Sequence, residues 1–485
     1  MASQSESLKD KTARGLLWGM MSNGSTQVLN LVFGIFLGRL LTPADYGMVG
    51  VLTIFTLIAG NLQSSGFTQA LTNMKSPTAR DYNSVFWFNI LVSISIYVIL
   101  YFCAPLIAAF FRQPELTRLS RFVFLSFVIS SFGIAHGAYM FKNLMVRQNT
   151  LAGFIALVTS GVSGVVLALN GASYWSLAWQ QIIYIAVLNI GRYACVPWRP
   201  SLRIDFGPVR RMFGFSVKIL FTSIINTLNS NLLVLVFGRM FPIKAVGCFT
   251  QANKWNTVAS SFLSGTVAQV AQPVMAQVAD DGERGRRVFR KMMRFAAFLS
   301  FPAMFGLSMT AEEFILLTIH DQWLGSVPLL RILCIGGAFM PLLTLYQNQM
   351  ISQGRSDVYL LCTVVQVSVQ LALVVIFARY GIEFMVALYT FFGIVFLAVW
   401  QHFLHCLTGI RVIDVAKDVC PFMLASAAVM AFTWFVTKPI SSLLLLFLCR
   451  VLLAAVLYFA VMKLAKVKIF DEAMKYMSKG KKVKE

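Results

Sequence analysis

The sequence predicts an all-α integral membrane protein of about fourteen transmembrane helices. We expect two parallel six-helix repeats that form a central cleft, followed by two extra C-terminal helices. Three observations predict this fold. The 485 residues are 58% hydrophobic and 12% charged, whereas a soluble chain carries about 25% charged residues. Apolar runs of about 20 residues, enough to cross about 30 Å of hydrocarbon, recur from end to end. The chain also repeats itself at a shift of 200 residues.

Apolar periodicity and turn residues such as Pro, Gly and Asn delimit the expected helices. These helices span residues 14–41, 45–71, 83–111, 119–140, 151–170, 174–196, 212–241, 245–272, 292–311, 327–350, 358–378, 382–406, 416–437 and 441–464. The predicted organisation is a cytoplasmic N-terminus (1–13), an N-lobe (14–200), a C-lobe (201–406), two further helices (407–464) and a basic cytoplasmic tail (465–485).

The distribution of charge predicts the orientation. The net charge of +22 is carried by short connections and by the tail rather than by a basic stripe, which argues against nucleic acid as a partner. The two termini and the even-to-odd connections carry about three times as many Lys and Arg residues as the opposite side. Both termini are therefore expected in the cytoplasm. The polar N-terminal segment lacks the features of a cleavable signal peptide, so the first membrane helix is expected to act in targeting.

Two similar stretches define the repeat: "LGRLLTPADYG" at 37–47 and "FGRMFPIKAVG" at 237–247. An even number of helices per copy keeps both copies in the same orientation, related by an axis along the membrane normal, as in one class of transporter. Both stretches are expected at outward hairpins, where Asp45 caps the following helix. A duplicated membrane scaffold without transport is the alternative. The shift aligns Gly38 with Gly238, Arg39 with Arg239 and Gly47 with Gly247.

Polar side chains form stripes along four of the expected helices, the first, second, seventh and eighth, and such stripes are costly against lipid. Interhelical hydrogen bonding explains the Ser, Thr and Gly positions, whereas the amides and lysines predict a water-filled cleft. Lys254 lies deeper than Lys218. Arg39 and Arg239, near the outer helix ends, bind substrate or anchor at lipid headgroups. The substrate-binding candidates are Asn23, Gln27, Asn30, Lys218, Asn226, Asn229, Gln251, Asn253, Lys254, Arg39 and Arg239.

The chemistry of this cleft favours an anionic, hydroxyl-rich substrate. No carboxylate is expected in the middle of a helix, while ammonium groups attract phosphate and amides bond to sugar hydroxyls. The basic connection 283–294 is expected to contact anionic membrane lipids, or alternatively to gather a pyrophosphate. Arg450 is expected to make a structural or lipid contact. No GxSxG, HExxH, P-loop or DxD motif occurs, so we expect no catalytic residue, metal or cofactor.

The first hairpin also carries a family resemblance. "LGRLLTPADYGMVGVLTIF" at 37–55 resembles the signature of the polysaccharide transporter family, the Wzx-type flippases of the MOP flippase superfamily, and "WRPSLRIDFGPVRRMFGFS" at 198–216 resembles its interlobe linker. The resemblance implies a bacterial inner-membrane flippase. Its substrate would be an undecaprenyl-pyrophosphate-linked oligosaccharide repeat unit, moved from the inner to the outer leaflet for lipopolysaccharide, capsule or exopolysaccharide.

The resemblance further implies cationic contacts to the pyrophosphate, which we carry onto Lys254 and Lys218. It implies a polysaccharide polymerase and assembly proteins as partners. The chain departs from internal symmetry where Ala245 stands opposite Asp45. A multidrug exporter of the same superfamily is an alternative, but an exporter of cationic drugs would need an acidic cavity. A membrane polysaccharide polymerase or glycosyltransferase is a further alternative, but a polymerase of this kind is expected to have a large outward loop.

Overall fold

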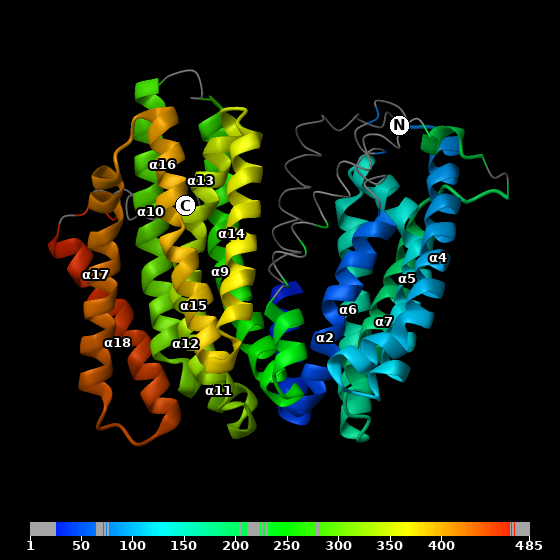
Figure 1. The fold of residues 1–485 in the computed structure, drawn as a ribbon, viewed down its shortest axis with the longest axis horizontal. Helices are drawn as coiled ribbons and strands as arrows, with labels where there is room; N and C mark the ends of the chain where they lie inside the picture. The colour runs from blue at the N-terminus through cyan, green and yellow to red at the C-terminus, as the bar shows by residue number, and fades with distance from the viewer. Residues whose placement is uncertain are drawn as a thin grey trace, which may run out of the picture. The chain divides into compact units, whose positions relative to one another are not determined.

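The protein is helical throughout the part that the structure describes. The computed structural model describes residues 26–64, 71, 74, 77–202, 205–210, 224, 227, 231, 233–277, 282–465, 467 and 470. The chain divides into two compact units, residues 1–247 and 248–485, and each is built from long helices (Figure 1). The predicted helical class is confirmed, whereas the count of fourteen helices stays a prediction because parts of the first and seventh lie outside the described residues.

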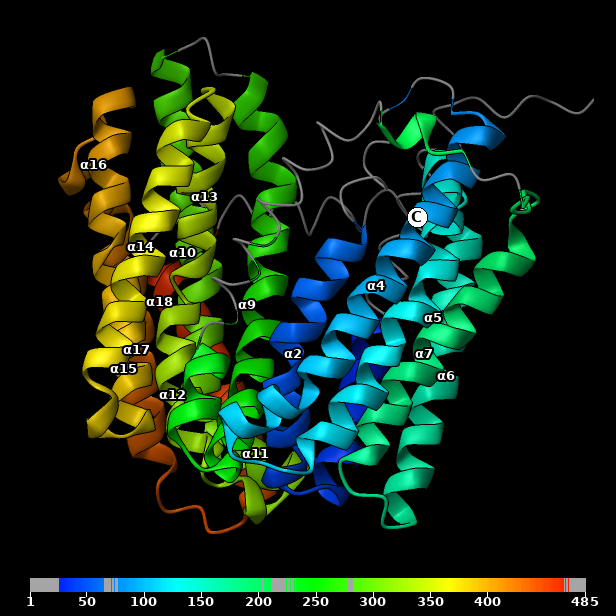
Figure 2. The ribbon, with the colours of Figure 1, turned by 45° about the vertical axis from the view of Figure 1, so that its right-hand side comes forward.

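In the first unit, α5 packs between α4 and α7, and α6 packs on α7 (Figures 1 and 2). Helices α4 to α7 begin and end within a few residues of the predicted limits, because apolar length and turn residues are local properties of the sequence. The described helices of this unit are a stretch over 26–40, α2 (Pro43–Ser64), α4 (Ala79–Phe111), α5 (Leu116–Lys142), α6 (Val146–Leu169) and α7 (Trp175–Cys195).

Some amides inside this unit join helices to each other. The Gln63 side chain donates to the carbonyl oxygen of Phe127 at 2.6 Å and accepts from the Ser130 hydroxyl at 2.7 Å. Asn189 of α7 donates to the carbonyl oxygen of Ile129 at 2.5 Å. Interhelical bonds of this kind satisfy polar groups that lipid cannot. For these two amides, interhelical bonding is therefore the role that the structure supports.

The segment after α7 is fastened to the bundle. The Trp87 indole donates to the carbonyl oxygen of Ser201 at 2.7 Å. The ring of Trp198 lies 5.0 Å from that of His136 and 5.8 Å from that of Tyr82, centroid to centroid. The beginning of the expected linker, from residue 198 onward, is thus held against α4 and α5 of the first unit.

The second unit continues the all-helical pattern, with its long helices side by side and α11 at one end in both views (Figures 1 and 2). Its packing pairs include α10 with α12 and α17, α12 with α15, and α17 with α18. The elements are α9 (Ile243–Gln277, which begins in the first unit), α10 (Gly282–Met309), α11 (Ala311–Ile319), η1 (Asp321–Trp323), α12 (Ser326–Gly337), α13 (Met340–Ser352), α14 (Ser356–Ile376), η2 (Ala378–Tyr380), α15 (Ile382–Val395), α16 (Leu397–Thr408), α17 (Val412–Thr437) and α18 (Leu443–Leu464).

Three local expectations for this unit are wrong. The basic segment 283–294, expected as a connection, forms the first turns of α10, because Arg and Lys are good helix formers. The expected single helix 382–406 is divided into α15 and α16. The expected single helix 327–350 is interrupted between α12 and α13. Gly336, Gly337 and Pro341 lie at that second interruption and supply its physical reason.

Two ion pairs, one partly buried and one fully buried, fasten the C-terminal helices to the rest of the second unit. At one end, Arg290 binds Asp418 through Nε and Nη2, at 2.6 and 3.2 Å. At the other end, the Arg450 guanidinium binds the Glu313 carboxylate, and both side chains are less than one-tenth exposed. Arg450 also donates to the Thr437 hydroxyl at 3.2 Å. The structural role expected for Arg450 is confirmed, and its partner is a carboxylate of α11.

The two hairpins at 37–47 and 237–247 have matching geometry. Each closes its first helix with a backbone N–H that donates to the carbonyl four residues earlier at 2.9 Å, from Leu41 in one hairpin and from Phe241 in the other. The next helix begins at Pro43 and at Ile243, again 200 residues apart. This agreement supports the repeat register read from the sequence.

Close backbone packing joins the hairpins within residues 1–247. A Cβ at Gly47 would collide with the carbonyl oxygen of Ile243, and a Cβ at Gly247 would collide with that of Pro43. Positions 43 and 243 are related by the same shift as 47 and 247, so the contacts are reciprocal, as across a local two-fold axis. Only glycine permits helix starts to approach this closely.

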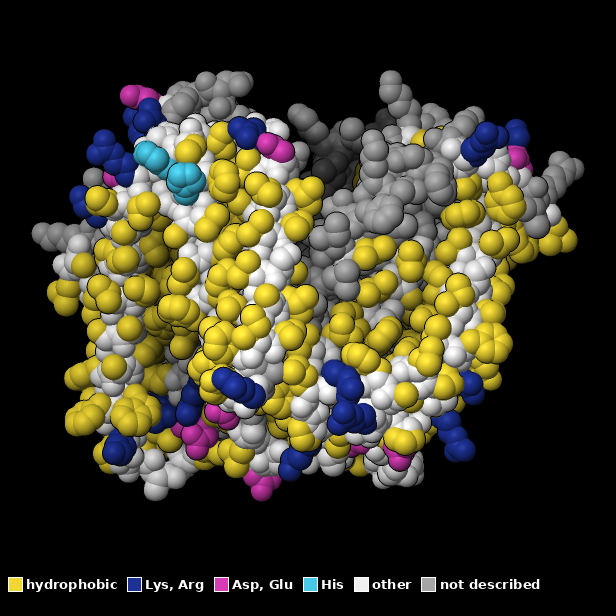
Figure 3. All heavy atoms as spheres, in the orientation of Figure 1, with side chains coloured by type: hydrophobic (Ala, Val, Ile, Leu, Met, Phe, Trp, Pro, Cys, Tyr) yellow, Lys and Arg dark blue, Asp and Glu magenta, His cyan; other side chains and the backbone are white. Residues whose placement is uncertain are grey.

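The surface is that of a multi-pass membrane protein. Within the described residues, ten helices are long and apolar enough to cross a membrane. On the face in Figure 3, hydrophobic side chains cover the middle of each unit and charged side chains gather toward the ends. A lipid-facing belt with charged ends is the pattern expected for helices that span a bilayer.

Candidate functional site

A half-open polar cavity of about 270 Å³ lies in the first unit, between the helix over 26–40, α6 and α7. Its lining combines amide and hydroxyl side chains with two leucines, and none of the described residues that line it is charged. The lining residues are Thr26, Asn30, Leu157, Ser160, Leu177, Gln180, Gln181 and Tyr184.

Helical spacing explains how these side chains converge. On α7, Leu177, Gln180, Gln181 and Tyr184 follow the spacing i, i+3, i+4 and i+7, which puts them on one face. The pairs contributed by the other two helices are likewise three or four residues apart. Gly161 of α6 lets the first helix approach, because a Cβ there would collide with the ring of Phe33.

The cavity can form hydrogen bonds in both directions. Asn and Gln side chains each present a carbonyl acceptor and an NH₂ donor, while Ser, Thr and Tyr hydroxyls both donate and accept. Such a lining matches a ligand whose part inside the cavity has many hydroxyl groups and no net charge. The volume lies near the lower limit of small-molecule pockets, about 300 Å³, so the cavity fits a small polar group.

The structure brings one predicted residue of the first helix, Asn30, into this cavity. Gln27 lies on the same helix with an exposed side chain and does not line the cavity. Four predicted residues lie outside the described residues, namely Asn23, Lys218, Asn226 and Asn229.

The predicted residues of α9 differ in burial. Gln251 is fully buried, and neither polar atom of its side chain has a hydrogen-bond partner among the described residues. Asn253 and Lys254 are partly exposed. The Lys254 ammonium lies 6.0 Å from the ring centroid of Trp255. Gln251 and Lys254 are three residues apart and therefore lie near the same face of α9, with Gln251 the more deeply buried of the two.

Arg39 and Arg239 lie at the exposed ends of equivalent helices in the two hairpins. The Arg239 guanidinium lies 5.4 Å from the ring centroid of Phe110. Asp45 is buried and contributes to the cap of α2 from inside the first turn, whereas Thr42 takes the N-cap position expected for Asp45: the Asp45 carboxylate accepts from the backbone N–H of Thr42 at 2.8 Å and from the Thr42 hydroxyl at 2.7 Å. Ser173, in the connection between α6 and α7, also donates to it.

The basic start of α10 is partly neutralised. Besides its bonds to Asp418, Arg290 approaches Asp414 at 3.5 Å, and Arg294 approaches Asp418 at 3.5 Å. These two arginines therefore hold α17.

Sequence reasoning missed Gln180, Gln181 and Tyr184, which are half of the polar lining residues. Their signal was an amide pair followed by a tyrosine on one face of an otherwise apolar helix.

Comparison with known proteins shows the family of the chain. Residues 36–328 match the family model described as "Polysaccharide biosynthesis protein". The chain is 25% identical over 359 residues to the lipopolysaccharide biosynthesis protein WzxC of Escherichia coli, covering 73% of this chain and 72% of WzxC. It is 26% identical over 360 residues to the teichuronic acid biosynthesis protein TuaB of Bacillus subtilis, covering 72% and 73%.

The fold is also that of solved membrane transporters. The lipid II flippase MurJ, in an inward closed conformation, superposes with a TM-score of 0.73 at 13% identity, over 92% of this chain and 99% of MurJ. A multidrug resistance MATE transporter of the MOP superfamily superposes with a TM-score of 0.62 at 15% identity, over 80% and 96%. The chain thus shares the fold of these two membrane proteins, and it belongs to the polysaccharide biosynthesis protein family.

Proposed function

We propose that the protein is a flippase that moves undecaprenyl-pyrophosphate-linked oligosaccharide repeat units from the inner to the outer leaflet of the bacterial inner membrane. Transport is by alternating access and supplies lipopolysaccharide, capsule or exopolysaccharide synthesis. The observation that carries the proposal is the uncharged cavity lined by Asn30, Gln180, Gln181 and Tyr184 in a multi-pass helical protein of this family. Amides and hydroxyls are the groups that bind sugar hydroxyls.

The proposed roles divide between sugar and pyrophosphate. The cavity in the first unit binds a sugar of the repeat unit, while the polyprenyl tail stays in lipid. Lys254 and Lys218 neutralise the pyrophosphate, since an ammonium group inside a membrane protein usually serves a ligand or an ion pathway. Both termini are cytoplasmic in this proposal. A polysaccharide polymerase and assembly proteins receive the product.

A multidrug exporter is the second candidate, because a MATE transporter shares the fold. Exporters of cationic drugs need a negatively charged cavity, and the lining of the cavity in the first unit includes no carboxylate. The relatives WzxC and TuaB are both named for polysaccharide biosynthesis. These two observations favour the flippase.

Deletion of the gene tests the proposal. We expect the deleted strain to lose surface polysaccharide and to accumulate a polyprenyl-linked oligosaccharide in the inner leaflet, because synthesis of the repeat unit continues while its transfer stops. Mass spectrometry of extracted lipids, with and without a membrane-impermeant reagent that modifies sugars in spheroplasts, measures the amount and the leaflet. Absence of an accumulating lipid-linked sugar contradicts the flippase assignment.

Rescue of the deleted strain connects this function to the cavity. The double variant Asn30→Ala, Gln181→Ala is expected to export about tenfold less polysaccharide than the wild type, since two lost hydrogen bonds at about 0.5–1.5 kcal/mol each amount to about one decade. Asn170→Ala is the matched control: its exposed amide donates locally to the carbonyl oxygen of Val166 at the end of α6. Equal rescue by the double variant and the control removes the cavity from the mechanism.

Lys254→Ala is expected to abolish surface polysaccharide at an unchanged protein level, because the pyrophosphate loses its ammonium partner. Lys254→Arg retains the charge and is expected to restore part of the export. Lys244→Ala is the control from the first turn of the same helix, where the side chain is exposed. Full export by Lys254→Ala would exclude the proposed pyrophosphate contact without affecting the cavity.

A further inference from the structure

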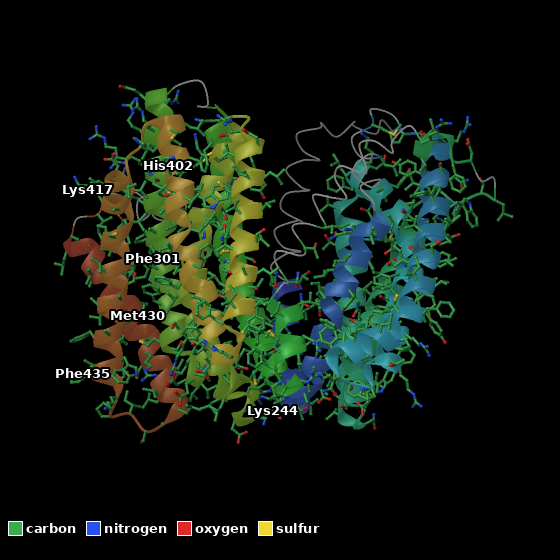
Figure 4. The ribbon with its side chains drawn as sticks, in the orientation of Figure 1. Lys244, Phe301, His402, Lys417, Met430 and Phe435 are labelled. Carbon is green, nitrogen blue, oxygen red and sulfur yellow. The ribbon has the colours of Figure 1, made fainter. Side chains whose placement is uncertain are left out.

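A groove of about 880 Å³ opens on the second unit between α10, α12 and α17. Its wall is mainly apolar, with Phe305, Ile335, Met430 and Trp434 among the lining residues. Phe435, at the end of α17, and Met430, further inside that helix, are labelled in Figure 4. All three helices belong to candidate membrane spans, so the groove opens toward the hydrocarbon rather than toward a soluble partner.

The polar end of the groove is formed by a single ion pair. Arg331 Nη2 lies 3.0 Å from Glu312 Oε2, and the two side chains are 45% and 50% exposed. The guanidinium carries five N–H donors and the carboxylate carries two oxygens, so this one bond leaves capacity on both partners. The rim therefore presents a cation and an anion side by side, with no net charge.

The neighbouring glutamate makes the opposite kind of contact. Glu313 is buried and bound to Arg450 of α18, whereas Glu312 points to the exposed rim. A buried pair holds helices together, while an exposed pair contributes about 0–1 kcal/mol to stability. Stabilisation of the fold alone therefore does not explain why the Glu312–Arg331 pair lies at the mouth of an apolar groove.

We propose that this groove binds a zwitterionic phospholipid with a primary ammonium, a phosphatidylethanolamine. The phosphate accepts hydrogen bonds from Arg331, the ammonium donates to Glu312, and an acyl chain lies between Phe305, Ile335 and Met430. Trp434 lies in the last turn of α17, and tryptophan is enriched at the ends of membrane-spanning helices. The neutral rim disfavours an anionic lipid, because the Glu312 carboxylate repels a second negative charge.

Native mass spectrometry of the full-length protein, purified in detergent and mixed with equal amounts of phosphatidylethanolamine and phosphatidylglycerol, tests the proposal. We expect the wild type to retain phosphatidylethanolamine in preference. Arg331→Ala is expected to lower that retention about tenfold, which corresponds to about 1.4 kcal/mol. Glu312→Gln leaves a net positive rim and is expected to reverse the preference, so that phosphatidylglycerol is retained more strongly.

Two further variants separate the groove from general effects of charge. Ala431→Trp fills the groove and is expected to lose both lipids. Arg355→Ala removes a similarly exposed pair with Asp357, at 47% and 66% exposure, outside the groove, and is expected to behave as the wild type. Equal retention of the two lipids by the wild type, unchanged retention by Arg331→Ala, or displacement by a polyprenyl phosphate would each overturn the proposal.

Discussion

Replacing Gly247 with alanine is expected to abolish polysaccharide export in the deleted strain. The added Cβ would collide with the backbone carbonyl of Pro43, and a backbone atom cannot rotate away as a side chain can. Overpacking of this kind costs about 1–3 kcal/mol, and the starts of α2 and α9 must separate to relieve it. Gly47→Ala is expected to have the same effect, since its contact with Ile243 is the reciprocal one. Export and membrane protein level, measured together, check both variants.

The same helices supply matched controls. Gly60 of α2 and Gly265 of α9 have no atom within 4 Å of an added Cβ. Alanine there should be tolerated, because it raises helix propensity by about 1 kcal/mol without a collision. If Gly247→Ala exports like Gly265→Ala, close packing of the two hairpins is not needed in the transport cycle.

Replacing Arg450 with alanine is expected to give the largest loss of stability. The change leaves Glu313 buried without its counterion, and breaking a buried pair costs about 3–5 kcal/mol. Thr437 loses its hydrogen bond to Arg450 as well. Thermal unfolding in detergent, followed by fluorescence or light scattering, should show a large fall in the midpoint temperature.

A double variant distinguishes an unpaired charge from lost packing. Arg450→Met with Glu313→Leu is expected to recover most of the stability, because an apolar pair of similar size often replaces a buried ion pair without cost. Arg331→Ala, at the exposed pair, should change stability by less than about 1 kcal/mol. An equally unstable double variant would show that the ion pair itself, and not an uncompensated charge, stabilises α18.

Much of the helical pattern could be predicted because its signals are local. The limits of α4 to α7 follow from apolar length and from turn residues such as Asn170 and Gly171. The hairpins could be predicted from Gly47 and Gly247, which recur at a fixed shift. The beginning of α10 was not predicted, because polarity alone does not end a helix and the Asp418 carboxylate that binds Arg290 lies 128 residues away.

The candidate site was predictable only in part. Asn30 could be singled out because three amides shared one face of one helix. The cavity also needs α6 and α7, and the sequence does not tell which helix faces meet. Gln251 illustrates the same limit: its polarity placed it among the substrate-binding candidates, whereas packing buries it inside the second unit.

By itself, the sequence determined the membrane class and most helix limits, because hydrophobic length, helical period and turn chemistry depend on neighbouring residues. Tertiary structure alone decided that Glu313 binds Arg450, that Gly247 meets Pro43, and that Gln180 and Gln181 share a cavity with Asn30. These contacts join residues far apart in the chain. Their energies come from desolvation and close packing, which exist only once the helices have come together.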